Sequence, residues 1–463
     1  MTTLRVAGFE RSRHQLSFEF TFERLHFAAS LWYETVDFDE LEARYGTPTM
    51  DDVYFHIGAY EVNKLCSLRP DTLDFGPFAH LVTDDFERTW RTIFRNVWAQ
   101  WRYENDLPDE NGPELELRDA SAVPAAVTLG AGGAVDVLAF CGGGKDSLVA
   151  LRLLERVGLP YASLAYSSSI YGRAEPQHDL IASLLDHCRP LTRHRQWLYD
   201  DIMDSPVVAL TPEAGVRTLT AGETPASIFE AIPIALAHGY RWFCLAHERS
   251  ADRGNLVWDV TGEEVNHQWG KSAAAERVLN DYVHSRLVTD LELFSVLKPV
   301  HDVLIFNLLA ENLDAVPAAH SCNVEKPWCR RCAKCTYVWL SYQAYLPTEL
   351  VDSIFAANLF DEPANRRWFR GMLGLEAHTP FECIGEVAEA RLAFELCREQ
   401  GLNGAAMAEY VRDVGHTDVA ATLDDYLTVN RSYRIPHPAG PAILDELERA
   451  SIRARARLFP QPA

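Results

Sequence analysis

Residues 135–150 read VDVLAFCGGGKDSLVA, and this stretch decides the fold. Val135–Phe140 has the apolar pattern of a buried strand, three glycines follow it, and an apolar helical pattern then continues to Gly158. Successive glycines let the backbone turn sharply and direct its N–H groups at an anion, while the following helix adds the positive end of its dipole. We therefore predict a phosphate-binding loop made of Gly142, Gly143, Gly144, Lys145, Asp146 and Ser147. Because Asp146 would repel a phosphate unless a cation lies between them, it also predicts bound Mg²⁺.

Strand and helix patterns alternate after this loop. Further strands are predicted at residues 161–166, 195–198 and 241–246, and helices at 175–187 and 227–238. This alternation predicts an α/β fold with a doubly wound parallel sheet, in which ligands bind at the carboxyl ends of the strands. Ser167 and the segment 247–250 follow predicted strands and are expected at that edge, with Ser167 beside the nucleotide.

The chain divides by composition into four regions. Residues 1–105 combine an alternating strand at 16–22 with an aromatic helical stripe from Trp90 to Trp101, which predicts an N-terminal α+β domain. Residues 106–133 are rich in acid, Pro, Gly and Ala and are predicted to be a linker. The nucleotide-binding domain is then predicted at 134–320, and a cysteine cluster with a helical C-terminal region at 321–463.

Composition excludes some classes of protein. The 463 residues include 43 basic and 66 acidic side chains, which gives 43 − 66 = −23. Such a charge disfavours nucleic acid as a partner, and we expect a small molecule instead. The N-terminus lacks a signal-peptide pattern and no apolar run reaches the roughly 20 residues of a membrane helix, so a cytoplasmic protein without membrane contact is expected. The oligomeric state does not follow from the sequence.

Four of the ten cysteines, Cys322, Cys329, Cys332 and Cys335, lie within 14 residues of one another. In a chain without an export signal, such clustering favours metal binding over disulfides. Four thiolates suit a tetrahedral structural Zn²⁺, with an iron–sulfur cluster as the main rival and reactive thiols as the lesser one.

Other polar segments are candidates for substrate contact. The segment 222–226, GETPA, reads as a helix cap with a Pro start. The segment 246–255 follows a buried strand and offers Glu248, Arg249 and Ser250, and the segment 265–272 offers His267, Gln268 and Lys271. Glu382 and Cys383 lie in a PFECIG segment, where a buried packing role is the alternative.

The glycine loop resembles the SGGxDS loop of the PP-loop ATP pyrophosphatases, a HUP-like fold, with Cys141 in place of the usual first serine. The order GGGKDS, GxTP, ExSA, VNHQxxKS, SCN…WCxxCxKC and PFECxG over residues 135–390 resembles the UDP-N-acetylmuramoyl-L-alanyl-L-glutamate epimerases of peptidoglycan precursor synthesis. Two positions depart from that pattern: Glu223 replaces a usual histidine, and His247 stands where asparagine is expected.

The resemblance implies an isomerase that uses ATP to adenylate the terminal L-glutamate, inverts its α-carbon and releases AMP and pyrophosphate. An adenylated carboxylate is easier to deprotonate at the α-carbon because its charge is masked and an enolate becomes accessible. Inversion then needs proton removal on one face and delivery on the other, by one mobile group or two fixed groups. The candidates for these catalytic roles are Cys383, Glu382 and His267, with Lys145 acting on the phosphates.

Two other functions fit parts of the pattern. A PP-loop enzyme that modifies tRNA or a deazaguanine would share the loop and a cysteine cluster, but the acidic net charge counts against tRNA. A regulatory protein with a degenerate nucleotide-binding loop is the non-enzymatic alternative, and the intact Lys145, Asp146 and Ser147 count against it.

Overall fold

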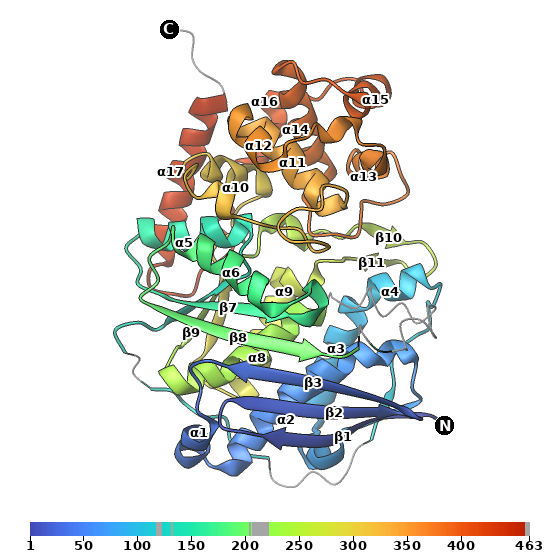
Figure 1. Ribbon diagram of the computed structural model, residues 1–463, viewed down its shortest axis with the longest axis vertical. Helices are drawn as coiled ribbons and strands as arrows, with labels where there is room; N and C mark the ends of the chain where they lie inside the picture. The colour runs from blue at the N-terminus through green and yellow to red at the C-terminus, as the bar shows by residue number, and fades with distance from the viewer. Residues whose placement is uncertain (117–122, 131–132, 203–204, 206–221, 459–463) are drawn as a thin grey trace.

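A single large mixed sheet forms the centre of the computed structural model, which describes residues 1–116, 123–130, 133–202, 205 and 222–458 (Figure 1). Within these residues ten strands follow the order β12-β9-β6-β7-β8-β3-β2-β1-β4-β5, and β10 pairs with β11 in a separate hairpin. The strand bounds are β1 (Thr3–Arg11), β2 (Gln15–Phe22), β3 (Leu25–Tyr33), β4 (Thr72–Asp74), β5 (Glu114–Leu115), β6 (Val137–Cys141), β7 (Ala162–Ser168), β8 (Thr192–Asp200), β9 (Trp242–Leu245), β10 (Leu256–Trp258), β11 (Glu263–Val265) and β12 (Glu292–Ser295).

The five strands from β12 to β8 are parallel to one another. The chain passes from β6 through β7 to β8 on one side, then crosses to β9 on the other side of β6. This reversal opens a crevice between the carboxyl ends of β6 and β9, the usual place for a ligand in such sheets. The parallel α/β sheet is confirmed, whereas membership of the PP-loop superfamily stays a prediction.

Both faces of this parallel half are buried. Leu138, Leu164 and Phe243 pack into one core with residues of α2, α8 and α9. Val137 and Ala139, which point to the opposite side, pack into a second core with α5, α10 and α11. The helices have the bounds α1 (Phe38–Tyr45), α2 (Thr47–Asn63), α3 (Asp84–Val97), α4 (Ala99–Glu104), α5 (Lys145–Arg156), α6 (Ala174–Leu185), α8 (Glu223–His238), α9 (Ala273–Arg286), α10 (Asp302–Leu309), α11 (Ala333–Tyr345), α12 (Thr348–Phe355), α13 (Arg366–Met372), α14 (Val387–Glu399), α15 (Ala405–Asp413), α16 (Val419–Tyr426) and α17 (Gly440–Leu458).

The N-terminal strands extend the same sheet. β3 pairs antiparallel with β8, so that Trp32 lies opposite Trp197. The alternating strand predicted at 16–22 is β2, and the aromatic stripe lies on α3 and α4, which meet at Trp98. The predicted domain boundaries stay predictions, and residues 117–122 and 131–132 of the predicted linker lie outside the described part of the chain. A buried ion pair between Asp52 of α2 and Arg286 of α9 ties the N-terminal elements to the rest.

The C-terminal helices gather at the end of the molecule opposite β1 to β3 (Figure 1). α14 lies against α11 and α16, while α17 lies against α10 and α5, so this helical region covers the side of the sheet that carries the glycine loop. The predicted helical C-terminal region is confirmed. Among the described helices, none combines the length and the apolar character required to span a bilayer.

Candidate active site

A cavity of about 270 Å³ lies at the crevice between the carboxyl ends of β6 and β9. Its walls come from segments that are up to about 240 positions apart in the chain, from the glycine loop to the PFECIG segment. Its polar lining residues are Gly142, Gly144, Asp146, Ser147, Tyr166, Tyr171, Gln177, Glu223, Thr224, Ser227, His247, His267, Gln268, Gly270, Lys271, His320, Ser321, Asn323, Lys326, Lys334 and Cys383.

The glycine loop forms one end of this cavity. α5 begins at Lys145, directly after Gly144, so its first backbone N–H groups point toward the loop. The Ser147 hydroxyl accepts a hydrogen bond of 3.2 Å from the N–H of Gly142 and thereby closes the turn. The uncapped start of a helix beside a glycine turn is suited to an anion such as a phosphate group.

Gly143 has to be a glycine in this fold. Its φ of +80° lies in the left-handed region, and a Cβ atom there would lie 2.2 Å from the His320 ring. The backbone N–H of His320 donates to the carbonyl of Gly143 at 2.9 Å. The segment that leads into the cysteine cluster therefore packs against the loop and supports it.

Lys145 is buried behind the loop. Its Nζ lies 2.5 Å from a carboxylate oxygen of Asp146 and 2.5 Å from one of Asp302 in α10. The Tyr337 hydroxyl donates to the other oxygen of Asp302 at 3.0 Å. The cation beside Asp146 in this structure is thus the lysine ammonium, and Mg²⁺ at Asp146 stays a prediction.

Cys383 marks the other end of the cavity. The Lys271 Nζ donates to its sulfur at 3.0 Å, and His267, whose Nδ1 lies 2.6 Å from Gln100 Oε1, also lies beside that sulfur. Burial opposes the thiolate, but the Lys271 ammonium and the His267 hydrogen bond outweigh it and lower the pKa of Cys383 to about 7. Such a thiol exchanges a proton readily at neutral pH.

His267, Glu382 and Cys383 also have potential metal-ligand atoms within 4.8 Å of one another. The ammonium of Lys271 already lies against the Cys383 sulfur, and its charge would compete with a metal cation there. The Glu382 carboxylate accepts from Asn323 at 3.0 Å and from the N–H of Cys383 at 2.9 Å. Glu382 thus supports the turn at Cys383, and it is not among the residues that line the cavity.

Glu248 lies buried beneath the cavity among lysines. Burial opposes its ionisation, but the nearby Lys271 and Lys145 lower the pKa of Glu248 to about 2. The Nζ of Lys298 donates to the carbonyl oxygens of Glu248 at 2.8 Å and Lys271 at 2.7 Å. These contacts with Lys298 fix the positions of the segments that carry His247 and Lys271.

The remaining predicted residues lie in different surroundings. Ser167 is buried within β7, and its hydroxyl has no hydrogen-bond partner among the described residues. Gln268 lines the cavity, and its amide donates to the carbonyl of Ile384 at 3.1 Å. Arg249 and Ser250 line neighbouring cavities, and the Ser250 hydroxyl donates to Glu389 at 2.8 Å. Their contact with substrate stays a prediction.

Sequence reasoning missed a pair of residues in the cavity wall. The Tyr171 hydroxyl donates to the Glu223 carboxylate at 2.8 Å, and both side chains line the cavity. Burial raises the pKa of Glu223 to about 7, although Lys64 opposes the shift. The GETPA segment could have pointed to Glu223, but the sequence pattern explains this residue as part of a helix start. The structure does place Glu223 in the first turn of α8.

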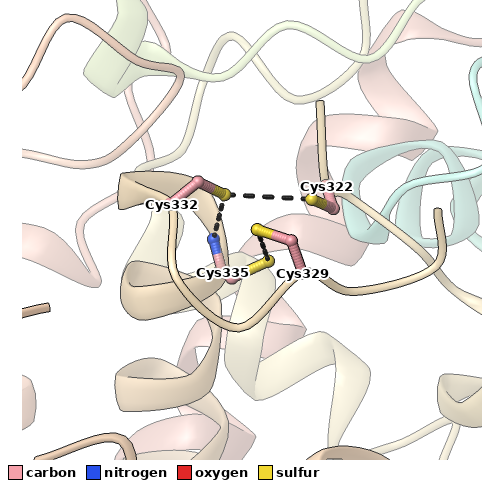
Figure 2. Close-up of side chains that lie close together, drawn as sticks. All are labelled: Cys322, Cys329, Cys332 and Cys335. Atoms are coloured by element: carbon pink, nitrogen blue, oxygen red, sulfur yellow. Dashed lines mark hydrogen bonds between the residues drawn. The ribbon is translucent and has the colours of Figure 1, made fainter. Parts of the chain in front are cut away.

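The four clustered cysteines converge from both sides of a short loop (Figure 2). The sulfurs of Cys322 and Cys332 are 3.8 Å apart, those of Cys329 and Cys335 are also 3.8 Å apart, and all four lie within 4.8 Å of one another. A disulfide needs about 2.05 Å, whereas a tetrahedron with Zn–S bonds of about 2.3 Å has sulfurs about 3.8 Å apart. The donor set and its geometry therefore fit a single tetrahedral metal ion.

Comparisons with known proteins agree with the order of these segments. A MurL N-terminal domain model matches residues 225–296, and a MurL C-terminal domain model matches residues 318–422. The UDP-N-acetyl-alpha-D-muramoyl-L-alanyl-L-glutamate epimerase of a Micromonospora species is 30% identical over 76% of this chain and 77% of its own length. The enzymes of that name from Salinispora tropica and Xanthomonas oryzae pathovar oryzae are 30% and 29% identical, over 66% and 70% of this chain and 65% and 70% of their own lengths. The chain therefore belongs to the UDP-N-acetyl-alpha-D-muramoyl-L-alanyl-L-glutamate epimerase family.

Proposed function

We propose that this protein is a cytoplasmic enzyme that epimerises the terminal L-glutamate of UDP-N-acetylmuramoyl-L-alanyl-L-glutamate to D-glutamate, with ATP as co-substrate. The observation that carries the proposal is that one cavity joins a glycine loop suited to phosphate with a half-buried thiol suited to proton transfer. The names of the relatives supply the substrate class, because each describes an epimerase of this UDP-muramoyl-dipeptide.

The loop end serves the first step. A carboxylate oxygen of the glutamate attacks the α-phosphorus of ATP, the bond from that phosphorus to the bridging oxygen breaks, and pyrophosphate leaves. The α5 N-terminus and the loop amide of Gly144 bind the phosphate oxygens, and Lys145 supplies a positive charge behind them. Mg²⁺ held by Asp146 would neutralise part of the charge on ATP.

The thiol end serves the inversion. The mixed anhydride makes the α-proton more acidic, and the Cys383 thiolate is one group that accepts or returns it. Lys271 stabilises that thiolate, and Lys271 and Lys334 place positive charge near the developing enolate. The second group is the Tyr171–Glu223 pair, since it lines the same cavity and Glu223 has a pKa near neutrality. Water then hydrolyses the adenylate and releases AMP.

The proposal is tested by incubating the protein with ATP, Mg²⁺ and the UDP-muramoyl-dipeptide and then determining the chirality of the recovered glutamate. We expect D-glutamate together with AMP and pyrophosphate. A Lys145→Ala variant should form little AMP, whereas an Arg431→Ala variant on the exposed surface of the C-terminal region should match the wild type. Unchanged L-glutamate without AMP would end the proposal, and adenylation of tRNA or a deazaguanine instead would favour the alternative PP-loop enzyme.

A further inference from the structure

We propose that the four-cysteine cluster is a structural zinc site and that the segment it orders, residues 320–337, holds the loop end and the thiol end of the cavity in register. The metal site stands on the cysteines alone. Its effect on catalysis rests on the proposed function.

The cluster has the features of a closed structural site. The sulfurs of Cys322, Cys332 and Cys335 belong to buried side chains, Cys329 is half-buried, and the spacing leaves room for one ion at the centre (Figure 2). The backbone N–H groups of Val324 and Glu325 donate to the Cys322 sulfur at 3.4 and 3.3 Å. Hydrogen bonds of this kind orient metal-bound thiolates and offset their charge. A multi-iron cluster needs more space than sulfurs within 4.8 Å provide.

The ordered segment contacts the glycine loop at two points. Two residues before Cys322, His320 packs against Gly143 and donates its backbone N–H to the Gly143 carbonyl. Two residues after Cys335, the Tyr337 hydroxyl donates to Asp302, which in turn binds the ammonium of Lys145. The position of Lys145 behind the loop therefore depends on how α11 begins, and α11 begins at the cluster.

The same segment contacts the thiol end at two further points. Lys334 lies between Cys332 and Cys335, and its ammonium donates to the carbonyl oxygen of Cys383. Asn323, next to Cys322, donates to Glu382, which accepts the N–H of Cys383. Residues within two positions of Cys322 and Cys335 thus contact Gly143, Asp302, Glu382 and the backbone of Cys383.

These contacts give the metal site a role beyond holding its own four ligands. Without metal, a segment with four free thiols and few regular hydrogen bonds has little to fix its course between His320 and α11. Metal loss should then disturb two ends of the cavity at once, although Cys383 is not one of the four clustered cysteines.

The first test measures the metal in the purified full-length protein. We expect about one zinc ion per chain, and replacement by Co²⁺ should give the visible absorption of a tetrahedral thiolate site. Cys329→Ser, chosen because Cys329 is the most accessible ligand, should lower the zinc content. Cys188→Ser, which removes a buried cysteine outside the cluster, should leave it unchanged. Protein without zinc or any other tetrahedral metal would overturn the site.

The second test follows both ends of the cavity in Cys329→Ser and in wild-type protein from which the zinc has been chelated and restored. We expect nucleotide binding to weaken about tenfold, within the usual range of coupling between sites, and the alkylation rate of Cys383 at pH 7 to change as well. Re-added zinc should reverse both effects, which separates loss of register from irreversible unfolding. If zinc removal leaves both measurements unchanged, the metal-ordered segment 320–337 does not hold the two ends of the cavity in register. Wild-type protein that holds zinc but binds no ATP would count against the proposed function alone. The effect of zinc on the alkylation of Cys383 would still test the metal site, because that measurement needs no turnover.

Discussion

Cys383 and Lys271 illustrate how two ordinary side chains become reactive when burial and charge act together. The thiol on its own would ionise reluctantly in a buried position, and the ammonium at 3.0 Å reverses that preference. The pair also shows that the functional state of Cys383 depends on a residue 112 positions earlier in the chain.

The first prediction concerns the pH dependence of this thiol. Since the thiolate is the form that reacts, alkylation of Cys383 by iodoacetamide, followed on its peptide by mass spectrometry, should rise with pH and reach half its maximum near pH 7. In Lys271→Gln the midpoint should move to higher pH, because the ammonium no longer opposes the effect of burial on the thiol pKa, while the His267 hydrogen bond remains. Lys271→Arg keeps a cation and should stay closer to the wild type. An unchanged midpoint in Lys271→Gln would show that the ammonium does not control the thiol.

The second prediction separates the two proton-transfer groups. In D₂O, Glu223→Gln should still form AMP. It should exchange the α-hydrogen for deuterium in only one configuration of the glutamate, and its rate of inversion should fall by about 100-fold or more. Cys383→Ala should show the opposite preference of configuration, because each variant keeps the group on the other face. Glu175→Gln, an exposed glutamate on α6, is the control. Wild-type inversion by Glu223→Gln would exclude the Tyr171–Glu223 pair from catalysis.

At the scale of elements, the turn between β6 and α5 depends on two glycines for different reasons. Gly143 has a left-handed backbone and His320 in the way of any side chain, whereas Gly142 has nothing within 4 Å of where a Cβ would lie. Gly143 is therefore required by the fold, whereas Gly142 leaves open space in the cavity.

The third prediction follows from this difference. Gly143→Ala should destabilise the protein by about 1–3 kcal/mol, since an alanine has to adopt a strained conformation there and displace His320. Gly142→Ala should leave the free energy of unfolding unchanged and weaken ATP binding, because its methyl group points into the space meant for phosphate. Urea denaturation and nucleotide titration measure the two effects. Equal losses of stability in both variants would contradict the assignment.

At the scale of the whole molecule, the N-terminal strands and the parallel half share one sheet and one core. The contact includes the Asp52–Arg286 pair, where burial raises the pKa of Asp52 to about 7 even though the guanidinium opposes the shift. Breaking the Asp52–Arg286 pair therefore tests how much the contact between α2 and α9 contributes to stability.

The fourth prediction is that Arg286→Met costs about 3 kcal/mol of stability, the lower part of the range for breaking a buried pair, because Asp52 can take up a proton when left alone. Urea unfolding should remain a single transition seen alike by tryptophan fluorescence and circular dichroism. Arg431→Met, which breaks an exposed ion pair with Asp445, should show no measurable loss. Two separate transitions would mean that the N-terminal part folds as an independent unit.

The sequence predicted the parallel strands and the loop because these depend on local pattern: β6, β7 and β9 are apolar, the glycine loop follows β6, and the segment 247–250 follows β9. Pairing between β3 and β8 could not be predicted, since strands about 160 residues apart carry no mark of their partner. The break at Trp98 was hidden because the aromatic spacing continues through it. Cys383, His267 and Lys271 were each named from the motifs, but only the fold brings them together. Glu223 was missed as a cavity residue because its place in the first turn of α8 already explained it.

The late position of Cys383 has a consequence for the protein during its synthesis. A chain emerging from the ribosome completes the glycine loop more than 200 residues before it reaches the thiol, and Lys334 and the cysteine cluster also come well after the loop. An unfinished chain therefore has the glycine loop without its contacts to His320 and Asp302 and without Cys383. On the proposed function, the cell is spared futile hydrolysis of ATP by nascent protein, because the capacity to use the nucleotide arises only when translation has passed the last wall of the cavity.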